Sequence, residues 1–291
     1  MEYYISQIIN GLCQGSIYAM MAIGFTVVVG VVGLVTFTHG EVIMLGAYAS
    51  FYAFQIFGNN FFIGLLAGFA ASWLIGIFIY KICYERFFDA PHHISLICTI
   101  GVSMLLKNLA QIIFGPNQKP VLNVVPNQFF GIGSIGVTLM QIIIIMTVVV
   151  LSGMLFLFFD KTKWGVQLRA VSQNKKAAAL MGINVRATTM LGNSIGCGFG
   201  GVAGMLLAIY YQNIVPTMGG AAGMKAFSAS VLGGMVNVPA AALGGILLGL
   251  IENLGITFTS GSMRDVFAFG FLVIFLLFMP GGLSSKKGGR P

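Results

Sequence analysis

The sequence predicts an all-α polytopic membrane protein, and its composition and charge pattern are the grounds for this. Its 291 residues are 57% hydrophobic and 8% charged, with a mean hydropathy of +0.94. A soluble domain carries about 25% charged residues, so a chain with so few charges needs lipid as its solvent. The 15 Lys and Arg outnumber the 7 Asp and Glu. They stand between apolar runs, which is typical of positive-inside topology rather than of nucleic-acid binding.

The first apolar run covers residues 5–35 and is longer than one bilayer crossing at about 1.5 Å per residue. It is either one tilted helix or a full helix followed by a short broken one. Polar residues then interrupt the apolar sequence over 35–48. Irregular backbone at membrane depth occurs where it lines a cavity or is buried in protein. This stretch therefore predicts a discontinuous helix beside a cavity.

Further apolar runs predict the next membrane segments: 42–57, 61–82, 94–114 and 137–159. The run at 61–82 leads into a charged turn that contains Asp89 and Pro91. Residues 115–136 are rich in Pro, Asn and Gly with one charge, Lys119, and are expected to form an outside loop.

Residues 161–186, here called the basic loop, interrupt the apolar pattern with six basic residues and no acid. Basic loops face the cytoplasm, so this loop orients the chain. The loops at 58–60, 115–136 and 211–222 are then outside, and the turn at 81–93 is inside. The N-terminus is inside only if 5–35 holds two segments.

The last third of the chain begins with a Gly-rich span at 187–211, whose small residues allow neighbouring helices to approach closely. Residues 225–235 are too few to cross alone and are expected to form a half-helix before the longer helix at 240–258. A last span at 264–279 precedes a basic tail. We expect eight to ten segments, at least two of them discontinuous, within a single membrane domain that spans 1–291.

Within the basic loop, Trp164 to Gly182 is a candidate for one short amphipathic helix. Val171, Ala178 and Met181 recur at roughly helical spacing. Gly182 suits the left-handed position that ends a helix. The basic side chains of this segment would then point to water or to a partner: Arg169, Lys175 and Lys176. The alternative is that the loop is basic only because it faces the cytoplasm.

Five polar residues in the apolar runs are candidates for a substrate pathway: His39, Glu41, Asn237, Glu252 and Asn253. His39 and Glu41 either line the pathway or form a hydrogen-bonded bracket that holds a broken helix. Glu252 is either a pathway group or a cap for the half-helix at 225–236, because an anion near a helix N-terminus is favoured by up to about 1 kcal/mol.

The sequence contains no Walker A motif, no HExxH and no GxSxG, and its three histidines have no third metal ligand at a useful spacing. It is therefore not expected to hydrolyse ATP or to act as an enzyme. A secondary transporter or channel is the alternative from another class. That alternative calls for intramembrane acids that coordinate ions, and Glu41 and Glu252 are the candidates.

Several motifs resemble those of a known transporter family. The segment Lys176-Ala177-Ala178-Ala179-Leu180-Met181-Gly182 resembles the EAA-xxx-G coupling loop of ATP-binding-cassette (ABC) importer permeases, with Lys176 in place of the acid. The segments around Gly15–Gly24, Thr38–Glu41 and Phe227–Glu252 are similar to branched-chain amino-acid ABC permeases of the LivH type. Met279-Pro-Gly-Gly-Leu283 resembles the closing motif of that family, with Met in place of Arg.

The resemblance implies an ABC importer permease fold and alternating access driven by two separate cytoplasmic ATPase subunits. It implies that the ATPases hold the basic loop through Arg169, Asn174, Lys176, Ala177, Ala178 and Gly182. ATP and Mg would be bound by those subunits, and no cofactor by this chain. The other partners implied are a second, related permease subunit, an external substrate-binding protein and membrane lipid, without nucleic acid. The implied location is the bacterial inner membrane, and the substrate is a branched-chain or hydrophobic amino acid, with urea or a short amide as the alternative.

Overall fold

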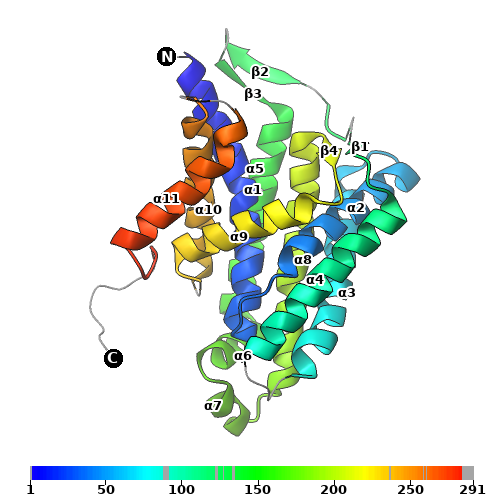
Figure 1. The fold of residues 1–291 in the computed structure, drawn as a ribbon, viewed down its shortest axis with the longest axis vertical. Coiled ribbons are helices and arrows are strands. Elements are labelled where there is room, and N and C mark those ends of the chain that lie inside the picture. Colours follow the sequence, from blue (N-terminus) through cyan, green and yellow to red (C-terminus); the bar gives the residue numbers. More distant parts are fainter. Residues whose placement is uncertain are drawn as a thin grey trace.

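Helices make up most of the residues that the structure describes, which confirms the all-α prediction (Figure 1). The computed structural model describes residues 2–87, 92–121, 124–126, 128–132, 135–235, 237–257, 259 and 261–283. The expected positions of Asp89, Pro91 and the basic tail at 284–291 lie outside these residues.

Helix α1 (Glu2–Val32) is the centre of the fold. It is a single 31-residue helix, which decides between the two interpretations of 5–35. It packs against α5, α8, α9 and α10. The contact with α10 is close because small residues meet there: a Cβ placed on Gly15 would lie 2.8 Å from the carbonyl oxygen of Ile246. Small residues at such contacts allow the two backbones to approach.

Helix α2 (His39–Phe57) begins only after a break, as the polar stretch at 35–48 predicts. Gly33, at the end of α1, has φ of +79°, a conformation that side chains other than glycine rarely adopt. In Figure 1, α2 begins partway along the neighbouring α1 and α8 rather than level with their ends. The break therefore places the first turn of α2 inside the helical bundle.

Helix α8 (Val185–Tyr211) carries the Gly-rich sequence into contact with α1, α2 and α3 (Phe61–Ile79). A Cβ on Gly24 of α1 would lie 2.6 Å from the carbonyl oxygen of Gly196, and a Cβ on Gly196 would lie 2.6 Å from that of Gly24. The expectation that these glycines permit close helix packing is confirmed.

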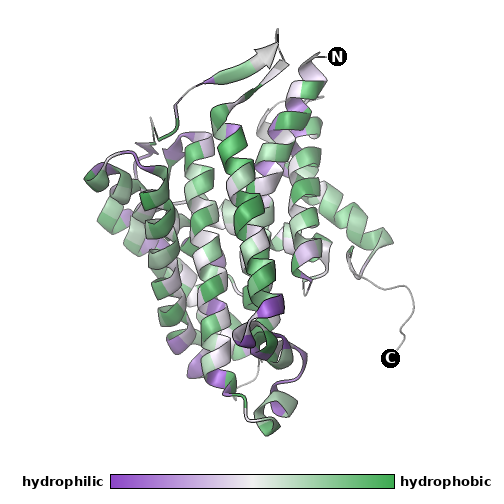
Figure 2. Ribbon diagram, turned by 180° about the vertical axis from the view of Figure 1, so that it is seen from behind, coloured by the Kyte–Doolittle hydropathy of each residue, from purple (hydrophilic) through white to green (hydrophobic). Residues whose placement is uncertain are grey.

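Three helices form the periphery and turn apolar side chains outward. They are α3, which continues as the π-helix η1 (Tyr80–Glu85), α4 (His92–Phe114) and α5 (Leu139–Lys161). Figure 2 shows them as predominantly hydrophobic along their length. Such surfaces suit contact with lipid or with another membrane subunit.

Two small antiparallel sheets lie in the segments expected to be loops. Strand β2 (Phe129–Ile132) pairs with β3 (Ile135–Thr138), and β1 (Lys119–Pro120) pairs with β4 (Asn213–Ile214). The segment expected to be an outside loop, 115–136, therefore contains short strands that were not predicted. The strands are short, so the apolar periodicity that predicted the helices does not reveal them.

The C-terminal third contains α9 (Met218–Gly233), α10 (Val238–Gly255), the 3-10 helix η2 (Gly261–Met263) and α11 (Arg264–Phe278). The half-helix expected at 225–235 was placed too late, because α9 begins at Met218. At 16 residues α9 still falls short of a full crossing. Asn237 begins α10 by accepting a hydrogen bond from the Ala240 amide at 3.3 Å, and the chain reverses there.

Six of the described helices are long and apolar enough to cross a membrane: α1, α3 with η1, α4, α5, α8 and α10. This is fewer than the eight to ten segments expected. The helices α2, α9 and α11 are apolar as well but are not among the six, and α9 and α11 have only 16 and 15 residues. Short helices of this kind agree with the prediction of discontinuous segments.

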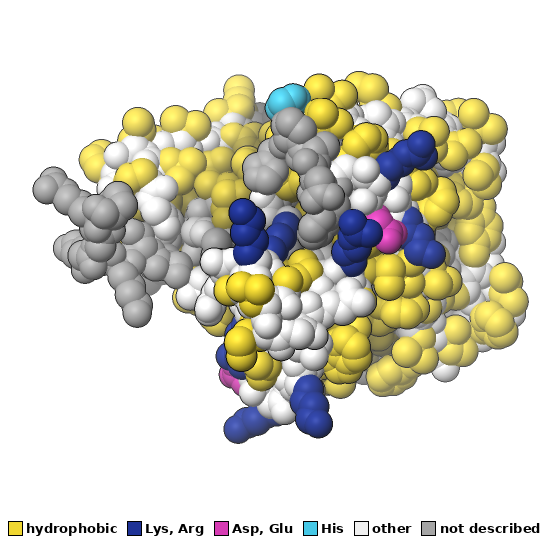
Figure 3. All heavy atoms as spheres, turned by 90° about the horizontal axis from the view of Figure 1, so that it is seen from below, with side chains coloured by type: hydrophobic (Ala, Val, Ile, Leu, Met, Phe, Trp, Pro, Cys, Tyr) yellow, Lys and Arg dark blue, Asp and Glu magenta, His cyan; other side chains and the backbone are white. Residues whose placement is uncertain are grey.

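The two ends of the bundle differ in charge. The helices of the basic loop, α6 (Lys163–Gln173) and α7 (Lys175–Leu180), lie at one end, and the N-terminus lies with β2 and β3 at the other (Figure 1). Figure 3 looks onto the end with α6 and α7 and shows several Lys and Arg side chains with few acidic ones. Because α1 is one helix, the N-terminus is opposite the basic loop.

Candidate functional site

The basic loop folds into two helices rather than the single one expected. The chain breaks at Asn174, which has φ of −156° and ψ of 104° and accepts a hydrogen bond from the Ala177 amide at 3.0 Å. This is an N-cap, the position that Asn favours. Thr162 caps α6 in the same way, accepting from the Gly165 amide at 3.0 Å. Asn174 therefore sets the bend between α6 and α7.

Gly182 ends α7 as predicted, with φ of +82°. The Gly182 amide donates to Ala179 O at 3.0 Å, and the Ile183 amide donates to Ala178 O at 3.1 Å. These two bonds satisfy carbonyls at the helix end. The loop is therefore an ordered, capped structure.

The inner face of the basic loop packs on the end of α1. Leu168, Val171 and Ala178 are buried in one cluster with Val31. Lys175 was expected to point to water or to a partner, but it turns inward: it is half-buried and donates from Nζ to the Val32 carbonyl oxygen at 2.6 Å. Burial lowers the pKa of Lys175 from its ordinary value. This bond joins α7 to the last turn of α1, immediately before the break that leads into α2.

The outer face of the basic loop carries the exposed side chains. Lys176, Ala177 and Arg169 are exposed, and Arg169 forms an ion pair with Asp160 at 3.0 Å. Met181 was expected on the buried face but is 82% exposed, next to Leu180, which is 88% exposed. The tip of α7 therefore presents two apolar side chains to solvent among basic residues.

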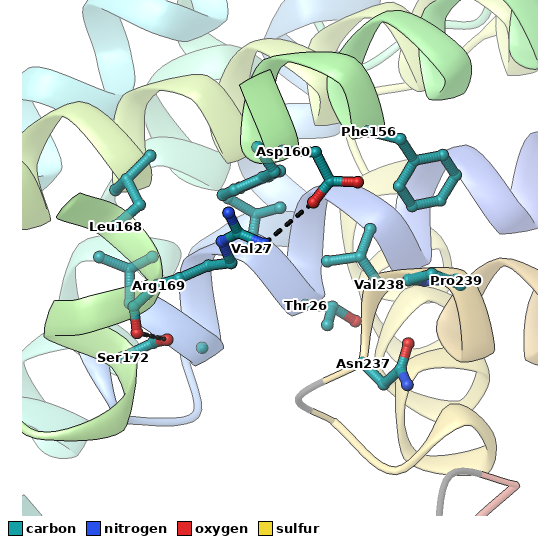
Figure 4. A pocket seen from close by; sticks show the side chains of 13 residues that line it. Thr26, Val27, Phe156, Asp160, Leu168, Arg169, Ser172, Asn237, Val238 and Pro239 are labelled. Atoms are coloured by element: carbon teal, nitrogen blue, oxygen red, sulfur yellow. Dashed lines mark hydrogen bonds and ion pairs between the residues drawn. The ribbon is translucent and has the colours of Figure 1, made fainter. Parts of the chain in front are cut away.

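A cavity of about 460 Å³ opens beside the basic loop and is here called the Arg169 cavity (Figure 4). The Arg169–Asp160 pair lies on one wall, and Asn237 and Pro239, at the start of α10, lie on another. Two residues that the sequence assigned to different roles, Arg169 and Asn237, thus line the same cavity. Asn237 also serves as the N-cap of α10.

A second cavity of about 490 Å³ lies between α1, α2, α4 and α9 and is here called the Glu41 cavity. His39 and Glu41 both line it, as expected for the broken helix. His39 packs edge-on against Phe25, with ring centroids 5.5 Å apart. The described residues provide no hydrogen bond between His39 and Glu41, so the bracket interpretation is not supported. Glu41 Oε1 accepts from Ser103 Oγ at 3.5 Å.

Glu252 and Asn253 lie elsewhere, in a buried polar network here called the Glu252 cluster. Glu252 is fully buried and pairs with Lys225 Nζ at 2.8 Å and Arg264 Nε at 3.3 Å. Lys225 lies in the middle of α9, so Glu252 does not cap the start of that helix. Asn253 donates to Gln14 Oε1 at 2.9 Å. The cluster joins α1, α9, α10 and α11.

The five predicted pathway residues therefore occupy three places: the Glu41 cavity, the Arg169 cavity and the Glu252 cluster. Lys225 and Arg264 were not predicted as functional residues from the sequence. Both are charges within or beside apolar segments, and a charge in such a position usually has a partner. The sequence thus indicates that Lys225 and Arg264 have acidic partners, although it does not indicate which acid each one contacts. The described residues include no group of three or more metal-ligating side chains.

Comparison with known proteins agrees with the resemblance. The family model described as "Branched-chain amino acid transport system / permease component" matches residues 7–276. The permease protein BraD of Pseudomonas aeruginosa, from a high-affinity branched-chain amino acid transport system, is 37% identical over 99% of this chain and 97% of its own length. The corresponding LivH protein of Escherichia coli K12 is 35% identical over 99% of this chain and 96% of its own length.

A more distant relative comes from Methanocaldococcus jannaschii and is described as a probable branched-chain amino acid transport permease protein LivH. It is 28% identical over 91% of this chain and 84% of its own length. No solved structure matches the chain. The family model covers most of the chain, as do relatives above 30% identity, and the helical membrane architecture agrees with both. The chain therefore belongs to the family of permease components of branched-chain amino acid transport systems.

Proposed function

We propose that this chain is a membrane-spanning subunit of an ATP-driven importer for branched-chain and other hydrophobic amino acids in the bacterial inner membrane. Two cytoplasmic ATPase subunits supply the energy by binding the basic loop. A second permease subunit completes the pathway, and an external binding protein delivers the substrate. ATP and Mg belong to the ATPase subunits. The names of the relatives support the substrate class.

The observation that carries this proposal is the exposed apolar tip of α7. Leu180 and Met181 are 88% and 82% exposed, beside a helix end that Gly182 and its hydrogen bonds hold in place. An ordered apolar protrusion in water is typical of a surface that a partner covers. The basic side chains around it provide charge complementarity for a partner with acidic residues.

Movement of the α7 tip has a direct route into the membrane. Lys175 holds α7 to the last turn of α1, and Leu168 and Val171 hold α6 to the same place. The chain breaks immediately beyond and enters α2, whose first turn lines the Glu41 cavity. A push on α7 would therefore act on the break between α1 and α2, and the rocking of one helical group against another would alternate access.

The test is to replace both apolar tip residues, Leu180→Glu with Met181→Glu, in cells that express the chain with its candidate partner subunits. We expect at least a tenfold loss of ATPase subunits that co-purify with the chain, with a matching loss of leucine uptake. Gln173→Glu is the control, because it adds an acid to the same loop without removing an apolar contact. Uptake of leucine by the chain alone, with no ATPase present, would instead indicate a secondary transporter or channel.

A further inference from the structure

We propose that the Glu41 cavity is a binding site for the transported amino acid within the membrane. Glu41 would bind the ammonium group, the first turn of α2 would bind the carboxylate, and the apolar wall would hold the side chain. This inference rests on the proposed function, because it takes a zwitterionic substrate with an apolar side chain as the cargo.

Glu41 provides the negative charge. It is only 4% exposed, and the carboxylate atom Oε2 has no hydrogen-bond partner among the described residues. The other oxygen, Oε1, accepts only a long hydrogen bond from Ser103 Oγ, at 3.5 Å, among the described residues. A buried carboxylate without an ion pair is costly. An ammonium group in the cavity would remove this cost.

Burial disfavours the charged form of Glu41, and two features nearby act in the opposite direction. Its carboxylate lies against Gly219, in the first turn of α9, where the positive end of a helix dipole favours an anion. Lys107 of α4 also attracts it, but no ion pair between the two is present among the described residues. The site therefore has a carboxyl group without a close cation among the described residues, and a bound ammonium group would favour its charged form.

The start of α2 provides the complementary group. Its N-cap residue, Thr38, makes no side-chain hydrogen bond to the first turn. First-turn N–H groups have no partner within their own helix, and together with the dipole they form a site for an anion such as a carboxylate. Glu41 is the third residue of α2, so both groups lie within one helical turn of about 5.4 Å. This spacing suits the adjacent ammonium and carboxylate of an amino acid.

The remaining wall is apolar and suits a hydrophobic side chain better than urea. The volume of the Glu41 cavity, about 490 Å³, lies within the range of about 300–1,000 Å³ that is usual for small-molecule sites. The apolar lining includes two aromatic rings, two flexible methionines and an isoleucine, namely Phe25, Phe227, Met104, Met224 and Ile100. Methionine adapts to different shapes, which would allow leucine, isoleucine and valine to share the site.

The experiment uses the complete transporter in lipid nanodiscs and measures equilibrium binding of radiolabelled L-leucine without the binding protein. The competitors separate the three contacts: 4-methylpentanoate lacks the ammonium, 3-methylbutylamine lacks the carboxylate, and glycine lacks the side chain. Wild type should prefer leucine to all three. Glu41→Gln should weaken leucine binding about tenfold or more, and should remove the preference for leucine over 4-methylpentanoate. Glu85→Gln, at an exposed acid outside the cavity, should change neither.

A second variant tests the wall without removing a charge. Met224→Trp should fill part of the cavity and weaken leucine binding more than alanine binding, whereas Met146→Trp, on the exposed face of α5, should not. If Glu41→Gln and Met224→Trp both bind leucine as wild type does, the Glu41 cavity is not the leucine-binding site. ATP-driven leucine uptake would then still support the proposed function. If the wild-type transporter carries urea and not leucine, the proposed function fails, and this inference fails with it.

Discussion

At the scale of single residues, the Glu252 cluster explains how this membrane chain accommodates buried charges. Glu252 is fully buried, and Lys225 Nζ lies 2.8 Å from one of its oxygens. Lys225 also reaches Asp265 at 3.1 Å and donates to the Tyr18 hydroxyl at 2.9 Å. Each polar group therefore offsets the desolvation of another. The cluster stabilises the packing of α9, α10 and α11 on α1.

Lys225→Met is expected to destabilise the fold by about 3 kcal/mol, because removing one partner of a buried pair leaves the other charge poorly compensated. Because Glu252 keeps its contact with Arg264 in this variant, we expect a loss of unfolding free energy at the lower end of the range measured for broken buried ion pairs. The measurement is the unfolding free energy of the purified chain in detergent.

The matched control for this prediction is the double variant Lys225→Met with Glu252→Leu. It removes one charge of each sign, so it should recover a large part of the lost stability. If the double variant is as unstable as the sum of the two single variants, the residues are not energetically coupled.

At the scale of elements, α7 depends on local capping more than on packing. The helix has six residues, from Lys175 to Leu180, too few to be stable alone. It begins at the Asn174 cap, ends at Gly182 and is held to α1 through Lys175 and Ala178. The direction of its exposed tip therefore depends on a few residues.

Gly182→Leu should reduce leucine transport at least tenfold while leaving the affinity of the external binding protein for leucine unchanged. No atom lies within 4 Å of a Cβ placed at Gly182, so the cost is conformational rather than steric. It is about 1–2 kcal/mol for an L-residue in the left-handed region. Uptake assays on membrane vesicles measure the effect.

Gly182→Asn is the control for this variant, because Asn tolerates the left-handed conformation better than Leu does. It should retain most of the transport. Full activity of Gly182→Leu would contradict the role of the α7 end in energy coupling.

At the scale of the whole molecule, the single helix α1 and the basic loop orient the chain. The N-terminus and the β2–β3 hairpin lie at the end of the bundle opposite α6 and α7 (Figure 1). Basic residues gather at the α6–α7 end (Figure 3), and the positive-inside rule predicts that this end faces the cytoplasm. We therefore predict that the N-terminus lies outside.

Ser172→Cys should react with an impermeant thiol reagent only from the cytoplasmic side, since Ser172 is exposed on α6. Asn59→Cys, in the exposed turn between α2 and α3, should react only from the outside. The unmodified chain provides the baseline, because its native cysteines are buried or half-buried. Labelling of Ser172→Cys from outside would invert the orientation.

Hydropathy and local capping were enough to predict much of this fold. The membrane class, most of the helical segments, the break before α2 and the left-handed Gly182 all depend on residues close together in the chain. The cap at Asn174 also depends on local sequence, although 164–182 was predicted as one helix. The strands β2 and β3 have four residues each, too few for an alternation of apolar and polar residues to predict them.

By itself, the sequence determined the class of protein, the position of the basic loop and the polar residues that needed an explanation. Tertiary structure decided which of them meet. Gln14 and Asn253 are 239 positions apart, and Lys175 bonds to a carbonyl 143 positions away. Helical periodicity gives the face on which a residue lies but not the helix that packs there. The partner of Glu252 and the open carboxylate of Glu41 therefore emerged only when the helices were in place.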